Sequence, residues 1–168
     1  MSTTAKKEEF IAIYNAKSDA VFKYCYYRTS DREIALDIMQ ESFMRLWNTL
    51  SEQREITSPQ AFLFTIARNL VIDYYRKKKT LSLDALAETD ENEYYLPKDL
   101  SEKINSEARY IIDKIQRLEP QYRQVVYLRY VEEMKPQEIA EIIGESANVV
   151  SVRINRGMEK LRAIVGDK

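Results

Sequence analysis

Asparagine, arginine and valine side chains share one face of the segment between residues 147 and 165, where they could read the edges of DNA bases. At about 3.6 residues per turn, the other face is apolar and predicts a buried stripe of Val150, Ile154, Met158, Leu161 and Val165. The outward set is Asn148, Val149, Val152, Asn155 and Arg156, with Arg153 at its flank. In a major groove, apolar groups contact thymine methyls, while Asn and Arg reach bases or phosphates. The pattern therefore predicts a DNA-reading helix.

Residues needed for most enzyme chemistry are missing from the chain. It contains no histidine and one cysteine, Cys25, so the usual general base, the commonest metal ligand and any internal disulfide are absent. We therefore expect a binding protein with no catalytic residue, no metal site and no cofactor. A lone cysteine fits a reducing cytoplasm. The start of the chain, Met1 to Glu9, lacks the apolar stretch of a secretory signal, and no run of about 18 apolar residues exists for membrane insertion. We expect a cytoplasmic protein.

The net charge of -1 conceals an uneven distribution. Residues 68–80 hold five basic side chains and one acidic one, whereas residues 84–102 hold seven acidic side chains and one lysine. The acidic stretch lacks helical periodicity and contains Pro97. We therefore predict two domains, 1–79 and 101–168, joined by an acidic linker at 80–100.

Both domains are expected to be helical, because only three glycines and four prolines interrupt the chain. In the first domain the pattern predicts three helices: Glu8 to Arg28, a second from the turn at Thr29–Asp31 to about Leu50, and a third that begins at Ser58-Pro59 and runs to about Lys78. In the second domain it predicts helices from near Leu100, from Glu119-Pro120 to Tyr130, from Pro136 to Gly144, and from about Ala147 to Val165.

The last two helices have the spacing of a helix-turn-helix: a short helix, a glycine in the turn and a longer second helix. A plain helical hairpin with a solvated basic face would give a similar pattern. The outward valines beside Asn and Arg favour the DNA-reading interpretation.

Two outward faces in the first domain also suggest partners. The second helix predicts a core stripe of Ala35, Ile38, Met39, Phe43 and Leu46, and an opposite, acid-rich face of Asp37, Gln40, Glu41 and Met44. That face suits a partner protein with basic side chains around a shallow apolar spot. The third helix predicts a core stripe of Leu63, Ile66, Ala67, Leu70 and Tyr74, and an outward set of Thr65, Arg68, Asn69, Ile72 and Arg76 that leads into Lys77–Lys79. Such a basic face could follow a DNA backbone, although both faces could also be merely solvated.

Three motifs resemble the extracytoplasmic-function group of bacterial sigma factors, within the sigma-70 family. The segment ALDIMQESFMRLW (Ala35–Trp47) resembles the part that grips the polymerase beta-prime coiled coil, and AFLFTIARNLVIDYYRKKK (Ala61–Lys79) resembles the helix that receives the minus-10 promoter element. The segment LEPQYRQVVYLRYVEEMKPQEIAEIIG, followed by NVVSVRINRGMEKLR, resembles the domain that binds the minus-35 element. The order of the motifs, from about Phe10 to Leu161, is also that of the family.

The resemblance implies two helical domains, sigma region 2 and the helix-turn-helix region 4, and three sets of binding residues. Core-polymerase binding falls on Asp37, Gln40, Glu41 and Met44. Minus-10 DNA binding falls on Asn48, Arg68, Asn69, Asp73, Arg76 and Lys77. Minus-35 DNA binding falls on Asn148, Val149, Ser151, Val152, Arg153, Asn155 and Arg156. The implied partners are core RNA polymerase, through its beta-prime coiled coil and beta flap, promoter DNA and an anti-sigma factor.

The resemblance further implies that the loop from Asn48 to Thr57 helps to capture a flipped minus-10 base, and that the acidic linker threads the polymerase channel. Phe62 and Leu36 stand where the family often has tryptophan and glutamate, which leaves the general role intact. Ser151 and Val152 replace a frequent Lys and Ser, so the promoter sequence stays open.

The implied function is promoter recognition and help in opening the DNA, without covalent chemistry in this chain. The alternative is a conventional helix-turn-helix regulator that binds duplex DNA without core polymerase. An enzyme is the least supported class, because no catalytic constellation is present.

Overall fold

The computed structural model describes residues 2–81 and 105–166 of the chain. Every regular element in these two ranges is a helix, and neither range contains a strand. The all-α prediction is therefore confirmed for the described part of the chain.

The chain divides into two compact units, Met1–Glu88 and Thr89–Lys168, and each is described by itself. The expected linker at 80–100 lies outside the described residues, apart from its first two positions. Those two, Thr80 and Leu81, still belong to a helix of the first unit.

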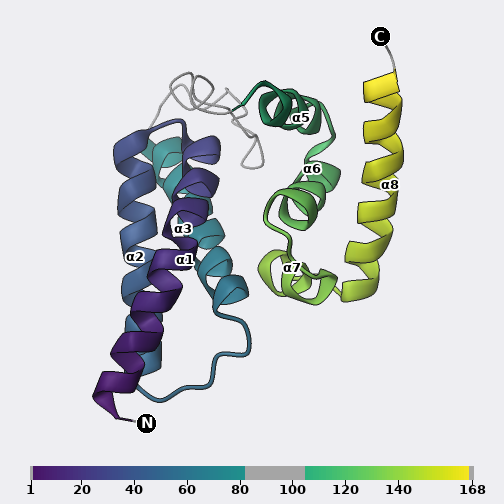
Figure 1. Cartoon of the computed structure of the whole chain (residues 1–168). Coiled ribbons are helices and arrows are strands. Elements are labelled where there is room, and N and C mark those ends of the chain that lie inside the picture. The colour runs from purple at the N-terminus through teal and green to yellow at the C-terminus, as the bar shows by residue number, and fades with distance from the viewer. Residues whose placement is uncertain (1, 82–104, 167–168) are drawn as a thin grey trace. The chain divides into compact units, whose positions relative to one another are not determined.

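Three helices make up the first unit: α1 (Thr3–Thr29), α2 (Arg32–Ser51) and α3 (Pro59–Leu81). The second and third agree closely with the prediction, whereas α1 begins five residues earlier than expected. α1 and α2 lie side by side, and α3 packs against both (Figure 1). A three-helix unit thus positions the residues that were assigned to polymerase and minus-10 binding.

A side-chain cap marks the start of each of these helices. The Ser2 hydroxyl accepts a hydrogen bond from Ala5 N–H, and the Ser58 hydroxyl accepts one from Ala61 N–H. Asp31 accepts one from Ile34 N–H at the start of α2. Such caps satisfy backbone donors that have no partner within the helix. The cap at Ser2 explains why α1 starts before Glu8, where the sequence pattern alone placed it.

The core of the first unit confirms one predicted stripe and corrects another. All five expected α2 core residues are buried: Ala35, Ile38, Met39, Phe43 and Leu46. On α3, Leu63 and Ala67 are buried, but Ile66, Leu70 and Tyr74 are only half-buried. Phe64 and Val71 are fully buried instead. Because α3 contacts both α1 and α2, its buried arc is rotated and wider than a stripe facing a single neighbour.

A polar cluster lies inside this core, around the end of α1. Arg28 is fully buried; one of its terminal nitrogens donates to the Tyr24 hydroxyl at 2.5 Å, and its guanidinium lies 5.3 Å from the Tyr24 ring centroid. The Tyr75 hydroxyl donates to the Arg28 carbonyl and ties α3 to α1. Burial raises the pKa of Cys25 to about 12. This thiol therefore stays protonated and behaves as a small core residue.

The second unit contains α5 (Ser106–Gln116), α6 (Pro120–Val126), the π-helix η1 (Tyr127–Val131), α7 (Pro136–Ile143) and α8 (Ala147–Gly166). Pro120 and Pro136 begin α6 and α7, as predicted. Proline lacks a backbone N–H, and an N–H at the first helical position would have no partner within the helix. The helix predicted from Glu119-Pro120 to Tyr130 ends in the π-helix η1, which the sequence pattern did not predict.

The turn after η1 is strained at one residue. Glu133 has φ 55, a left-handed conformation that side chains with a Cβ rarely adopt. Arg129 helps to hold this turn, because its guanidinium donates to the Met134 carbonyl at 3.0 Å. The turn places α7 at the start of the helix-turn-helix.

A close contact between α6 and α8 sets the position of the last helix. Gly157 is buried on α8, and a Cβ at this position would lie 2.7 Å from Val126 Cγ2 and 3.3 Å from Tyr122 Cβ. On the same side of α8, Lys160 forms a 3.1 Å ion pair with Glu119. The two hydrogen bonds that Glu119 accepts, from Lys160 and Gln121, lower its pKa. At position 157, only a residue without a Cβ lets α6 and α8 approach this closely.

We expect Gly157→Ala to destabilise the second unit. Alanine in a helix interior is normally favoured over glycine by about 0.5–1 kcal/mol, but overpacking a tight contact typically costs about 1–3 kcal/mol. The net result should be faster hydrogen exchange of the α8 amides in the full-length protein. Gly166→Ala is the matched control, because nothing lies within 4 Å of a Cβ there. Equal or greater protection in Gly157→Ala would contradict the close contact.

Candidate functional site

The start of α8 is fixed by the turn that precedes it. Gly144 adopts φ 73 and donates its N–H to the Ala140 carbonyl at 2.9 Å, which closes α7. The Ser146 hydroxyl then accepts a hydrogen bond from Val149 N–H at 3.2 Å. α7 and α8 pack against each other in the second unit (Figure 1). This is the arrangement expected of a helix-turn-helix.

The outward face of α8 gathers the residues predicted to bind minus-35 DNA within its first three turns. Asn148, Val152, Asn155 and Arg156 are exposed, with Val152 at 40%. Val149, Ser151 and Arg153 are half-buried at the edge of this face. Four residues of types that suit base edges therefore share one exposed surface.

The buried stripe of α8 is shorter than predicted. Val150 and Ile154 are buried, whereas Met158 and Leu161 are only half-buried and Val165 is 42% exposed. The buried face contains Gly157 in addition to Val150 and Ile154. A glycine carries no hydrophobic signal, so the pattern of apolar residues could not indicate it.

Arg153 forms an ion pair within the protein. Its guanidinium lies 3.5 Å from the Glu145 carboxylate, and 27% of its side chain is exposed. An ion pair this open to solvent is weak. Arg153 can therefore exchange this carboxylate for a phosphate at small cost.

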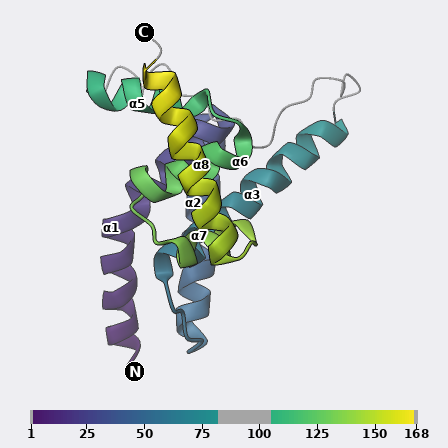
Figure 2. The ribbon, with the colours of Figure 1, turned by 90° about the vertical axis from the view of Figure 1, so that its right-hand side faces the viewer.

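The α3 residues predicted to bind minus-10 DNA form a track along the helix and not a compact site. Asn69, Asp73, Arg76 and Lys77 are all exposed. Figure 2 shows the C-terminal part of α3 running away from α1 and α2. Asp73 lies 3.9 Å from Arg76, a long and exposed ion pair. The basic end of α3 is thus open to an anionic partner.

Arg68 differs from the other residues of this track. It is half-buried, and its Nε is buried without a hydrogen bond. Burial raises the pKa of the Tyr24 hydroxyl. The positive charges of Arg28 and Arg68 oppose this rise, so Arg68 lies close to Tyr24. Arg68 therefore reaches into the bundle as well as lying beside the exposed track.

The acid-rich face of α2 is exposed as the sequence pattern predicts. Asp37 and Gln40 are exposed, and Met44 is 61% exposed. Glu41 is half-buried and forms a 3.0 Å ion pair with Arg45. A single exposed apolar side chain is common on protein surfaces, so the interest of Met44 depends on the apolar pocket beside it.

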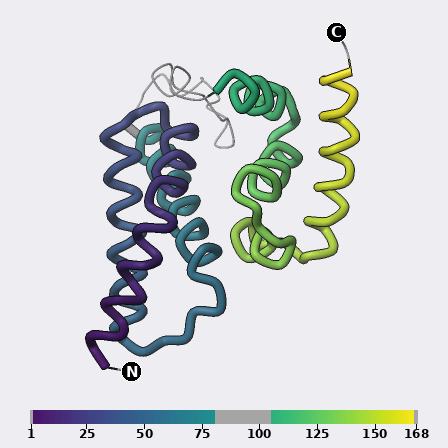
Figure 3. Tube along the Cα trace, in the orientation of Figure 1, coloured from purple at the N-terminus to yellow at the C-terminus, as the bar shows by residue number. Residues whose placement is uncertain are grey.

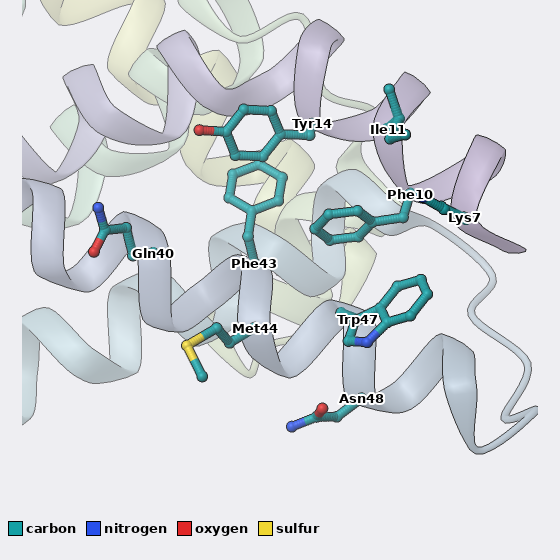
Figure 4. Close-up of a pocket in the computed structure, with 9 residues that line it drawn as sticks. All are labelled: Lys7, Phe10, Ile11, Tyr14, Gln40, Phe43, Met44, Trp47 and Asn48. Carbon is teal, nitrogen blue, oxygen red and sulfur yellow. The ribbon is translucent and has the colours of Figure 1, made fainter.

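An apolar pocket of about 620 Å³ lies between α1 and α2 beside this face. Aromatic rings from both helices line it: Phe10, Tyr14, Phe43 and Trp47 (Figure 4). The Tyr14 and Phe43 ring centroids are 4.8 Å apart, and those of Phe10 and Trp47 are 5.4 Å apart. The α1 side of this pocket was not predicted, although Phe10 and Tyr14, aromatic residues four positions apart, could have indicated it.

Asn48 lies away from the other residues predicted to bind minus-10 DNA. It lines the apolar pocket together with Gln40 and Met44, at four-residue spacing on α2 (Figure 4). The structure therefore places Asn48 beside the residues predicted to bind core polymerase. The loop that follows α2 forms a second pocket of about 450 Å³, which is lined mainly by polar residues.

Within the described ranges, no group of three or more Cys, Asp and Glu residues is placed to hold a metal ion. No helix in the same ranges is long and apolar enough to cross a bilayer.

Comparisons with known proteins support this geometry. Residues 13–80 match the family model for Sigma-70 region 2, and residues 108–161 match that for Sigma-70, region 4. The ECF RNA polymerase sigma factor SigW of Bacillus subtilis is 32% identical, over 96% of this chain and 91% of SigW. This chain belongs to the ECF sigma factors of the sigma-70 family. SigM of the same organism is 30% identical, over 90% of this chain and 92% of SigM.

The family membership settles the general function. The protein is a sigma factor that directs RNA polymerase to promoters, and sigma factors are regulatory subunits without enzymatic activity. The alternative, a conventional regulator that acts without core polymerase, is not favoured. The two domains match sigma regions 2 and 4, as the resemblance implied.

The fold agrees with a solved sigma factor structure. The sigma factor RpoE from Bartonella quintana, in its co-crystal with the anti-sigma factor NepR, superposes with a TM-score of 0.71 at 19% identity. The match covers 96% of this chain and 99% of RpoE. At this identity the comparison supports the fold alone.

We expect Glu145→Gln to strengthen duplex DNA binding by the sigma factor. Loss of the exposed ion pair should change the free energy of unfolding by at most about 1 kcal/mol. The freed Arg153 can then contact a phosphate, which should steepen the slope of log affinity against log salt by about 0.9. Fluorescence anisotropy titrations at several salt concentrations measure this slope. Glu141→Gln, the same charge change at an exposed α7 position, is the control; an equal slope change there would refute the release of Arg153.

Proposed function

We propose that this sigma factor acts through three surfaces: one for core polymerase, one for the minus-10 strand and one for the minus-35 duplex. The observation that carries the proposal is that the three predicted residue sets are largely exposed and, once Asn48 is grouped with the α2 set, lie on three different helices, α2, α3 and α8. The protein acts in the cytoplasm, where RNA polymerase works.

The core-polymerase surface combines the α2 face with the apolar pocket beside it. Asp37 and Glu41 provide negative charge, and Met44 provides an exposed apolar group at the pocket edge. A helical partner with basic side chains around an apolar ridge would complement both features. The beta-prime coiled coil of the polymerase is the partner implied by the family resemblance, and Asn48 at the pocket edge joins this surface.

The minus-10 surface follows α3 and the loop before it. Asn69, Arg76 and Lys77 are exposed along a helix that rises about 1.5 Å per residue. From the loop to Lys77 such a track is long enough for several nucleotides of an extended strand. Cationic and amide side chains follow the backbone, while the pocket in the loop receives one extruded base.

The minus-35 surface is the outward face of α8. Asn155 and Arg156 can donate to base edges, and Val152 can contact a thymine methyl. Ser151 and Arg153 lie at the edge of the face, where they can reach phosphates.

Two further partners complete the proposal. The beta flap of the polymerase would bind the second unit, where Tyr110, Ile111 and Val165 are exposed apolar side chains on the neighbouring helices α5 and α8. An anti-sigma factor would cover one or more of these surfaces, since RpoE was solved with such an inhibitor.

We expect Asp37→Lys together with Glu41→Lys to weaken core-polymerase binding at least tenfold. Like charges placed across an interface cost several kcal/mol, and a tenfold loss corresponds to about 1.4 kcal/mol. Titration of labelled sigma factor with purified core polymerase measures the effect.

Asp19→Lys on α1 is the control, because it makes one such charge reversal at an exposed position away from the pocket; each single α2 variant is compared with it directly. A folded double variant with undiminished polymerase binding would refute the proposed core surface. A conventional regulator would keep its DNA binding and have no polymerase affinity to lose.

Arg156→Ala should weaken promoter binding by about 1–3 kcal/mol if the side chain reads a base. The measurement is holoenzyme binding to a set of duplexes that differ at each minus-35 position. Base reading predicts a loss concentrated at one position, whereas an equal loss on all sequences would identify a phosphate contact. Arg162→Ala, six residues further along α8, should leave the sequence preference unchanged.

A further inference from the structure

The C-terminal end of α3 has little packing of its own. Among the described side chains of α3, Val71 is the last buried one, and residues 76–80 are all exposed. Arg76 to Lys79 are four consecutive basic residues, which we call the basic end. A short helical segment without packing contacts is only marginally stable in water. The basic end therefore depends on the residues just before it for its position.

Tyr75, directly before the basic end, is the residue that ties α3 to α1. Its side chain is half-buried, and its hydroxyl donates a hydrogen bond to the Arg28 carbonyl. That carbonyl lies in the last turn of α1, where backbone acceptors have no partner within the helix. Figure 3 shows the C-terminal end of α3 at the same end of the unit as the turn between α1 and α2. A side chain of α3 thus completes the hydrogen bonding of α1.

The acceptor of this bond belongs to a rigid part of the core. The Arg28 side chain is fully buried, and one of its terminal nitrogens donates to the Tyr24 hydroxyl at 2.5 Å. Tyr24 is also fully buried, and its ring centroid lies 5.2 Å from that of Phe64 on α3. Because side chains in a close-packed core have little room to shift, the Arg28 carbonyl is a fixed point. The bond from Tyr75 therefore attaches the end of α3 to the core.

A hydrogen bond at this position controls the direction of the basic end. Lys77 lies six residues beyond Val71, which is about 9 Å along the helix axis. If α3 bent by about 20° just after Val71, Lys77 would move by about 3 Å. Hydrogen bonds from nitrogen to phosphate oxygens need distances of about 2.7–3.2 Å, so such a shift forces a side chain to readjust or to lose its contact. The Tyr75 hydroxyl opposes this bend.

We propose that Tyr75 is a positioning residue for minus-10 DNA, because its hydrogen bond to the Arg28 carbonyl keeps the basic end in line with the rest of α3. Arg76 and Lys77 then continue the track that Asn69 begins, along the backbone of one strand. The inference rests on the proposed minus-10 surface of α3. Tyr75 acts through Arg76 and Lys77 and does not itself contact the DNA.

The test is a double-mutant cycle with holoenzyme and single-stranded minus-10 DNA from a promoter identified by transcript mapping. Tyr75→Phe removes only the hydroxyl, and we expect about fivefold weaker binding, which corresponds to the net contribution of one hydrogen bond. The Arg76→Ala, Lys77→Ala background should bind more weakly, with a slope of log affinity against log salt that is shallower by about 0.7 for each phosphate contact. In that background Tyr75→Phe should cost about twofold or less, because the side chains that it positions are gone.

Tyr74→Phe is the matched control. Tyr74 is the neighbouring residue and is half-buried like Tyr75, but its hydroxyl has no hydrogen bond within the described part of the chain. This variant should bind the strand as the wild type does. The affinity of Tyr75→Phe for core polymerase should also be unchanged, because the α2 face is untouched. Circular dichroism checks that each variant is folded before it is assayed.

The outcomes separate the inference from the proposed function. If the Arg76→Ala, Lys77→Ala variant binds the strand as the wild type does, the basic end is not part of the minus-10 surface, and the inference falls with that part of the proposal. If this variant binds weakly but Tyr75→Phe binds like Tyr74→Phe, the surface stands and positioning by Tyr75 is wrong. Equal losses from Tyr75→Phe in both backgrounds would indicate a direct DNA contact or a general loss of stability, and would also overturn the inference.

Discussion

A unit of about 60–80 residues has a single hydrophobic core and buries only roughly 60% of the surface of its unfolded chain. Each helix therefore packs against this core on one side. Each long helix of this sigma factor therefore has a core side and a free side. On α2 the sequence alternates between the two within one turn, from buried Phe43 to exposed Met44. On α8 buried Ile154 is followed by exposed Arg156. The proposed binding surfaces are these free sides, so the core packing that fixes each helix also determines which residues a partner can meet.

Charge separates the free sides from one another. The α2 face carries Asp37 and Glu41, and the end of α3 carries Arg76 and a run of lysines. Both faces belong to one small unit, so a polyanion is repelled by one and attracted by the other. The ion pairs on these faces, Glu41–Arg45 and Asp73–Arg76, are exposed to solvent, and exposed pairs contribute about 0–1 kcal/mol. They can be exchanged for a partner's charges without loss of the fold.

Sequence periodicity predicted the features that depend on a single helix and missed those that depend on two. The α2 core stripe and the outward face of α8 follow from residue spacing alone. The rotated α3 core, with Phe64 and Val71 at its centre, depends on the simultaneous contacts with α1 and α2. The aromatic pocket and the hydrogen bond from Lys6 to the Ser51 carbonyl at the end of α2 arise where α1 meets α2. Gly157 gives no hydrophobic signal, although it sets the closest approach of α6 and α8. The π-helix η1 and the left-handed conformation of Glu133 were not predicted either. Glutamate rarely adopts a positive φ, and π-helices are rare.

The reading helix offers few cations, and this limits what the second unit can do alone. Arg156 is exposed and Arg153 shares its charge with Glu145, so few phosphate contacts are available on the face that carries the base-reading residues. Because non-specific DNA affinity grows with the number of neutralised phosphates, duplex binding by α8 should be weak by itself. Two weak sites on one chain, however, bind with an effective concentration set by the chain that joins them. In the proposed scheme, core polymerase would add a third attachment through the α2 face. Tight promoter binding is then expected only from the assembled holoenzyme, which keeps the free sigma factor from occupying promoters without the polymerase.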